Sequence, residues 1–134
     1  MKSILKLTTI LFCIILISSC TKNPIIGTWQ YDGGLYNGRE QKASIDFLMQ
    51  RTYTGNTFEA FLIEGTAKPE LYSSGIYVIK SDTLLITSKF SSRPSQNTDL
   101  TISYNYVIDQ NNLTIKGVLP NGMIVEEYWK KVKQ

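Results

Sequence analysis

The segment LTISYNYVI, residues 100–108, sets the fold class of this chain. Leucine, isoleucine and tyrosine occupy every second position, and threonine, serine, asparagine and valine occupy the positions between them. A period of two is the spacing of a half-buried β-strand. The same alternation recurs in most of the chain after residue 25, and no segment longer than a turn has the period of a helix.

The alternating segments are separated by short runs of turn-forming residues. They predict eight strands, at about residues 26–32, 43–54, 57–64, 72–80, 83–90, 100–108, 113–119 and 123–132. Residues 33–38, GGLYNG, are predicted to form a loop after the first strand, and residues 91–97, SSRPSQN, form the most polar predicted loop. Short connections make neighbours in sequence pair in the sheet, and closing the sheet removes both exposed edges. We therefore predict an all-β fold, an eight-stranded antiparallel up-and-down β-barrel.

The first 19 residues have the pattern of a secretory signal peptide. Lys2 and Lys6 precede the apolar run at residues 7–17, which has about half the length of a membrane span. The following ISSC, residues 17–20, resembles a bacterial lipobox. That resemblance implies that the Cys20 thiol accepts a diacylglycerol and that its amine, after cleavage, takes a further acyl chain such as palmitate. An ordinary signal peptide that happens to contain a cysteine remains the alternative.

This N-terminal pattern divides the chain into a signal peptide at 1–19, a lipidated tether at 20–25 and a barrel domain at 26–134. Two or more acyl chains anchor a protein stably to a membrane. The tether TKNP, residues 21–24, lacks the acidic run that resembles a surface-export signal. We therefore expect a lipid anchor in the outer membrane, on the periplasmic side rather than the cell surface.

Composition argues against catalysis. The chain has no histidine, Cys13 lies in the signal and Cys20 would carry lipid, so no thiol remains for nucleophilic, disulfide or metal chemistry. Glu126 and Glu127 are adjacent in a strand, point to opposite faces and cannot share a site. We expect no enzyme activity, no metal and no cofactor. Without the two lysines of the signal, 12 basic residues face 11 acidic ones, and this balance argues against nucleic-acid binding.

Three landmarks follow the lipobox in order: GTW at 27–29, GIYVI at 75–79 with DTL at 82–84, and EYWKKV at 127–132. Together they resemble the lipocalin-like lipoproteins of Gram-negative bacteria of the gut and mouth type, over about residues 25–132. The resemblance implies a small barrel with an internal cavity, in which Trp29 closes one end beneath a basic residue of the last strand. Lys130 or Lys131 would fill that place, and we assign barrel closure to Trp29 and Lys131. A cation on an indole contributes about 0.5–2 kcal/mol.

Arg51 and Tyr53 share one strand face with Phe47 and Met49. An inward arginine with a tyrosine two residues on resembles the carboxylate clamp of intracellular fatty-acid carriers, in which the guanidinium fork takes the acid. The alternative is that the strand leaves the barrel at this point and that Arg51 is simply solvated.

Five tyrosines lie on predicted strands, Tyr72, Tyr77, Tyr104, Tyr106 and Tyr128, and among them Tyr77, Tyr104 and Tyr106 are further candidate ligand-binding residues. Their rings offer an apolar face with a polar tip, which suits a pocket or an interface, and core packing is the alternative. The sequence Asp82-Thr83-Leu84 also resembles the sequon at which some Gram-negative bacteria attach sugars to exported proteins, so that Thr83 would be glycosylated. A simple hairpin turn explains the same residues.

The sequence thus predicts a membrane-anchored, lipocalin-like lipoprotein that binds a small hydrophobic or amphipathic ligand in the cell envelope. The alternative is a protein-interaction module, an inhibitor or accessory subunit of an envelope complex, with a filled barrel and with exposed tyrosines and the loop at 91–97 as its contacts. A cavity of several hundred Å³ lined by apolar side chains favours the first. A filled interior with an exposed aromatic patch favours the second.

Overall fold

The computed structural model describes residues 23–93 and 96–133, and all regular secondary structure in this part of the chain is β. The strands are β1 (Gly27–Tyr36), β2 (Arg39–Gln41), β3 (Leu48–Tyr53), β4 (Thr57–Ile63), β5 (Glu70–Lys80), β6 (Thr83–Ser91), β7 (Thr101–Asp109), β8 (Asn112–Val118) and β9 (Ile124–Lys131). Within these described ranges, no helix has the length and apolarity needed to cross a membrane. The predicted signal peptide at 1–19 and the predicted lipidation site Cys20 lie outside the described residues.

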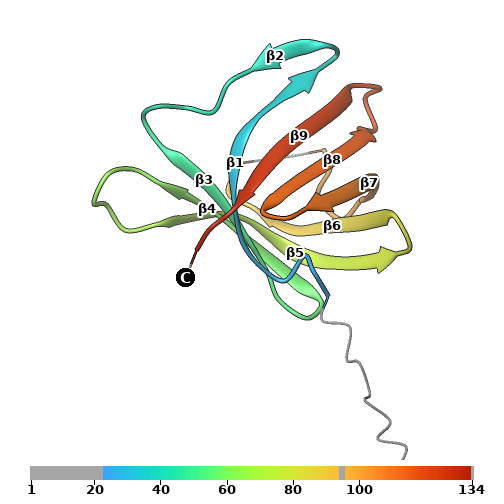
Figure 1. Cartoon of the computed structure of the whole chain (residues 1–134), viewed down its shortest axis with the longest axis horizontal. Helices are drawn as coiled ribbons and strands as arrows, with labels where there is room; N and C mark the ends of the chain where they lie inside the picture. The colour runs from blue at the N-terminus through green and yellow to red at the C-terminus, as the bar shows by residue number, and fades with distance from the viewer. Residues whose placement is uncertain (1–22, 94–95, 134) are drawn as a thin grey trace, which may run out of the picture.

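All strands belong to one antiparallel sheet that closes on itself. From β3 to β9 each strand pairs with the next in sequence, and β1 pairs with both β3 and β9. Figure 1 shows β9 returning alongside β1 to complete the wall. β1 and β3–β9 form an eight-stranded barrel, and β2 adds a short hairpin to the end of β1. The predicted antiparallel barrel is confirmed, with one additional strand.

The loop predicted at residues 33–38 was wrong for its first four residues. β1 continues to Tyr36, through a bulge between Tyr31 and Gly34 that shifts its register with β9. Gly33 supplies the positive φ of +110° that the bulge needs. The turn itself is Asn37-Gly38, with φ of 50° and 77°, the two-residue hairpin connection that Asn-Gly favours.

The strand predicted at residues 43–54 is shorter than expected and begins at Leu48. Ile45, which the alternation placed on a buried face, is 99% exposed. The chain bends here, and the backbone N–H of Asp46 donates to the Ser44 hydroxyl at 3.1 Å. The physical reason is the extra strand, because residues 42–47 must lead from the end of β2, opposite Gly34, back to the barrel wall at Leu48.

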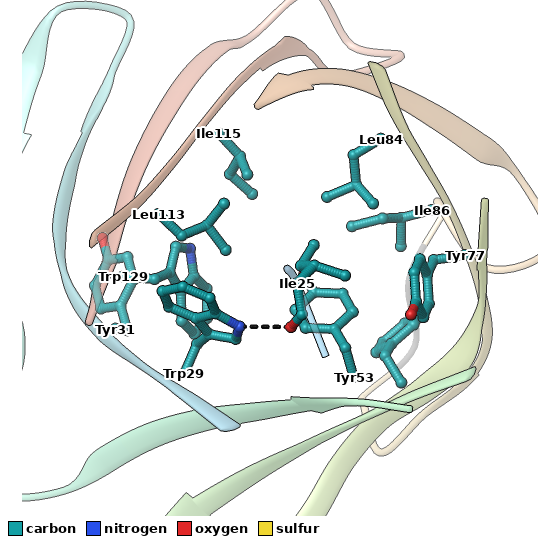
Figure 2. Close-up of a cluster of buried hydrophobic side chains, with 11 residues drawn as sticks. Ile25, Trp29, Tyr31, Tyr53, Tyr77, Leu84, Ile86, Leu113, Ile115 and Trp129 are labelled. Carbon is teal, nitrogen blue, oxygen red and sulfur yellow. Dashed lines mark hydrogen bonds between the residues drawn. The ribbon is translucent and has the colours of Figure 1, made fainter. Parts of the chain in front are cut away.

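One half of the barrel is filled with apolar and aromatic side chains. They come from the ends of β3, β5 and β9, from the starts of β4, β6 and β8, from β1, and from Ile25, two residues before β1. Figure 2 shows them meeting from opposite walls; they are Ile25, Trp29, Tyr31, Tyr53, Phe58, Tyr77, Leu84, Ile86, Leu113, Ile115 and Trp129. We call this half the closed end. The opposite end, where β3, β5 and β9 begin, is the mouth.

Candidate functional site

Residues 23–26 seal the closed end before the chain enters β1. Ile25 is fully buried, and its carbonyl accepts a hydrogen bond from Trp29 Nε1 at 2.8 Å, the dashed contact of Figure 2. The Asn23 side chain donates to the Tyr77 hydroxyl at 3.4 Å, and that hydroxyl in turn donates to the Thr54 carbonyl. The buried indole and phenol groups are therefore satisfied, as buried polar groups must be. A ligand cannot enter from this side without breaking those contacts.

A lysine of the last strand lies on the tryptophan of the first. Lys131 is the register partner of Trp29, and its Nζ atom is 4.5 Å from the centroid of the indole. The same Nζ donates to the Ile26 carbonyl. Lys130 points outward and pairs with Asp32 at 3.1 Å. Lys131 and not Lys130 therefore occupies the position on the ring.

Arg51 lies inside the barrel and not in solvent. Its Cζ atom is 4.8 Å from the centroid of Trp129 and 5.5 Å from that of Phe58. Its Nη1 atom donates to the Tyr53 hydroxyl at 3.3 Å. Because Tyr53 and Trp129 belong to the packed core, the guanidinium rests directly on the filled half.

Glu127 faces the same interior from β9. Its Oε1 atom accepts from the Tyr36 hydroxyl and its Oε2 atom accepts from Trp129 Nε1, both at 3.2 Å. The Tyr36 hydroxyl also lies 3.0 Å from that of Tyr31. Both oxygens of the carboxylate are therefore hydrogen-bonded. Arg51 and Glu127 are the charged groups of this part of the interior. We call them, together with the neighbouring side chains of Tyr72 and Trp129, the charged floor.

Burial and charge shift the pKa values of this group in consistent directions. Burial opposes the charge on Arg51, but Tyr53, Tyr72 and Glu127 outweigh it and raise its pKa, so the guanidinium stays protonated. Burial raises the pKa of Tyr72, and Arg51 offsets part of that rise. Burial, followed by Glu127, raises the pKa of Tyr104 to about 12. Tyr72 and Tyr104 therefore remain neutral hydrogen-bonding groups at physiological pH.

The mouth holds a cavity of about 380 Å³. It is lined by side chains of β3, β4, β5 and the end of β6: Phe47, Met49, Leu62, Glu64, Glu70, Tyr72, Ser91, Ser92 and Arg93. Its walls are thus apolar at Phe47, Met49 and Leu62 and charged at the rim. Tyr72 lines the cavity and also lies close enough to Arg51 for the two groups to affect each other's pKa. Broader hollows of about 540 and 750 Å³ lie over outward-facing residues of β7–β9 and around the sealed end.

The predicted site residues do not all meet. Arg51 and Tyr53 are hydrogen-bonded to each other, whereas Tyr104 packs against the core and lies near enough for both residues to affect its pKa. Tyr77 is buried in the closed end, and the Tyr106 hydroxyl donates to the Ser81 carbonyl at 3.2 Å. These last two tyrosines serve the core and a turn at the closed end.

Glu127 and Tyr36 were not predicted as site residues, and Tyr72 was predicted only as one of five strand tyrosines suited to a pocket or an interface. The spacing showed that Glu126 and Glu127 face opposite ways, but not which one faces inward, because that depends on the register between β9 and β1. The position of Tyr72 depends on a register shift between β4 and β5, which leaves Tyr72 without a paired residue on β4. Tyr36 was assigned to a loop. Within the described ranges, no group of three or more acidic or thiol side chains could hold a metal ion.

The predicted glycosylation site lies at a hairpin. Ser81, with φ of 57°, and Asp82 connect β5 to β6, and Thr83 Oγ1 donates to Asp82 Oδ1 at 3.3 Å. Leu84, the residue that the sequon needs after the threonine, is fully buried in the core. The turn therefore accounts for these residues structurally, and the modification of Thr83 stays a prediction.

Comparison with known proteins supports the fold. No family model matches the sequence, and no curated protein matches it. Among solved structures, a lipocalin-like protein from Bacteroides uniformis aligns with a TM-score of 0.60 and 14% identity, covering 81% of this chain and 98% of that one. A redesigned β-barrel aligns with a TM-score of 0.49, 14% identity and coverage of 81% and 92%. The first likeness shows that this chain has a lipocalin-like fold.

Proposed function

We propose that this protein binds a small hydrophobic or amphipathic ligand in the mouth half of its barrel. The observation that carries the proposal is the unequal filling of the interior. The closed end is packed by the core, whereas the mouth retains a cavity of about 380 Å³ near Arg51, a half-buried residue whose Nε atom is buried. That volume lies in the range of small-molecule sites, and a lipocalin-like barrel is a ligand-binding fold.

The test is native mass spectrometry of the protein purified from its own membranes. We expect the wild type to carry a small molecule, and Met49→Trp to lose it because the new ring fills the cavity. Leu48→Trp is the matched control, since Leu48 is the preceding residue, is 41% exposed and does not line the cavity. Equal retention by both variants would place the ligand elsewhere, and no bound molecule in the wild type would refute the proposal.

We also propose that the barrel is anchored in the outer membrane, on the periplasmic side, by lipid on Cys20. Support comes from the ISSC sequence at residues 17–20 and the short tether after it. Labelling of cells with an alkyne analogue of palmitate should mark the wild type and not Cys20→Ser. A mature protein whose N-terminus is not Cys20 would contradict the anchor while leaving the ligand site untouched.

The interaction-module alternative loses part of its support. Of the tyrosines that it required on the surface, Tyr77 is buried and Tyr104 and Tyr106 are half-buried against the core. The outer face does expose aliphatic side chains, Val107, Val118 and Ile124 among them. The ligand-binding function is therefore the better supported of the two.

A further inference from the structure

Two polar atoms beside the mouth cavity lack partners. Within residues 23–93 and 96–133, the buried side-chain atoms without a hydrogen bond are Arg51 Nε and the Tyr72 hydroxyl. Buried donors are paired in most proteins, and leaving one unpaired costs free energy. Here both belong to neighbouring side chains, because Arg51 offsets part of the rise in the pKa of Tyr72, so a single acceptor can serve both atoms.

The surroundings of Arg51 show which of its groups are already engaged. The Tyr53 hydroxyl accepts a hydrogen bond from Arg51 Nη1, and the rings of Phe58 and Trp129 lie within cation–π distance of the guanidinium. These contacts fix the plane of the side chain on the core. They hold the guanidinium, and Glu127 acts on its charge from further away, but in the described part of the chain no carboxylate lies within ion-pair distance of Arg51.

Tyr72 connects this cation to the cavity. Its ring lines the mouth cavity, whereas its hydroxyl is buried beside Arg51. An acceptor at the inner end of the cavity would receive a donor from each. We propose that the ligand carries a carboxylate and that Arg51 and Tyr72 bind this group, with the apolar part of the ligand against Phe47, Met49 and Leu62. This inference rests on the proposed function and names the class of ligand.

The structure changes the role that the sequence suggested for Tyr53. Tyr53 is 2% exposed, and its hydroxyl already accepts from Arg51. It is therefore a positioning residue, and Tyr72 takes its place as the second donor to the acid.

Glu127 restricts the charge that the floor accepts. Its carboxylate is held by Tyr36 and Trp129 and lies near enough to raise the pKa values of Tyr72 and Tyr104. The floor thus has one positive and one negative group. For a monoanion the attraction to Arg51 exceeds the repulsion by Glu127. A dianion such as a phosphate monoester is repelled more strongly by Glu127.

Calorimetric titration of the mature protein in lipid nanodiscs tests this, with empty nanodiscs as the blank. The probes are octanoate, octanol, octyl phosphate and octylammonium, which share one tail and differ in charge. We expect octanoate to bind best. Arg51→Met and Tyr72→Phe should each weaken octanoate about tenfold or more and leave octanol unchanged, since a hydrogen bond to a charged group contributes about that factor.

Tyr128→Phe is the matched control, because the Tyr128 hydroxyl pairs with Glu126 on the outer face. Glu127→Gln should raise the affinity for octyl phosphate more than that for octanoate. Tyr72→Phe removes a single oxygen, so it gives a result even if Arg51→Met does not fold.

The outcomes separate the two proposals. Equal affinity of octanoate and octanol in the wild type would overturn the carboxylate site, leave the ligand-binding function standing and assign the unpaired atoms to water. An unchanged octanoate affinity in Tyr72→Phe would remove Tyr72 from the site. Absence of binding by all four probes would count against the proposed function itself.

Discussion

Arg51 lies over the face of Trp129, with its Cζ atom 4.8 Å from the ring centroid. The edge of the same indole donates to Glu127. The face of an aromatic ring is negative and its N–H edge positive, so one tryptophan orients a cation and an anion at once. The two charges are held in the barrel by this ring and not by a salt bridge with each other, which leaves Arg51 available to an external acid.

Trp129→Phe should separate the two functions of that ring. Phenylalanine keeps a face for Arg51 but removes the donor to Glu127, so we expect a loss of about 2–4 kcal/mol in the free energy of unfolding from the hydrogen bond and the lost volume. Urea denaturation measures it. In Glu127→Gln the same substitution should cost less, because the acceptor is no longer charged. An equal cost in both backgrounds would show that the indole N–H does not stabilise the carboxylate.

Lys131→Met should destabilise the barrel more than Lys130→Met. Lys131 contacts the face of Trp29 and donates to the Ile26 carbonyl, whereas Lys130 forms an exposed ion pair with Asp32. We expect a loss of about 1–2 kcal/mol for Lys131→Met, and about 0.5 kcal/mol or less for Lys130→Met. Thermal or urea unfolding of the two variants checks this difference. Equal losses would mean that the closure contributes no more than a surface charge.

Gly34→Ala should weaken the seam between β1 and β9. A Cβ atom at Gly34 would lie 2.5 Å from the Glu126 carbonyl oxygen, so the two strands would have to move apart. Overpacking of this kind costs about 1–3 kcal/mol. Gly55→Ala is the control, since a Cβ there meets nothing within 4 Å and its φ is not positive. Hydrogen exchange should show faster opening of β1 and β9 in Gly34→Ala alone, and unchanged exchange would contradict the close approach.

Stability should fall at alkaline pH. The folded-state pKa of Tyr104 is raised from 10.0 to about 12, and those of Tyr72 and Tyr36 are raised as well. The folded protein therefore holds protons that the unfolded chain releases above pH 10, and the stabilisation is lost as pH rises from 10 towards 12. Urea denaturation over that range measures the slope. Tyr104→Phe should make the slope shallower, whereas Tyr128→Phe on the outer face should change it less; an unchanged slope in Tyr104→Phe would refute the assignment.

The alternation of apolar residues was sufficient to predict the strands from β4 to β9, and the short connections between them, with the cost of exposed edges, predicted the closure of the sheet. The alternation failed around β1 and β2, because it treated Gly33 and Gly34 as a turn. In the structure the glycines serve a bulge and a close approach, while Asn37-Gly38 makes the turn. A glycine pair gives the same signal for both uses, and only the position of β9 decides between them.

The site was predictable in part for a similar reason. A period of two identifies which residues share a face, so Arg51 and Tyr53 could be grouped from the sequence. It does not identify which face is inside or what lies across the barrel. Trp129 and Glu127 reach Arg51 only because the last strand closes against the first, a contact between residues far apart in the chain. The inward position of Tyr72 depends on a register shift between β4 and β5, which the alternation of apolar residues does not reveal.

The seal formed by residues 23–26 has a consequence for delivery. Asn23 is three residues from Cys20, so a lipid on that cysteine would keep the closed end of the barrel within about 11 Å of the bilayer surface. The opening would then point into the aqueous compartment. The ligand would be exchanged with soluble donors or with a protein that faces the mouth. The membrane leaflet that holds the anchor would not supply the ligand directly.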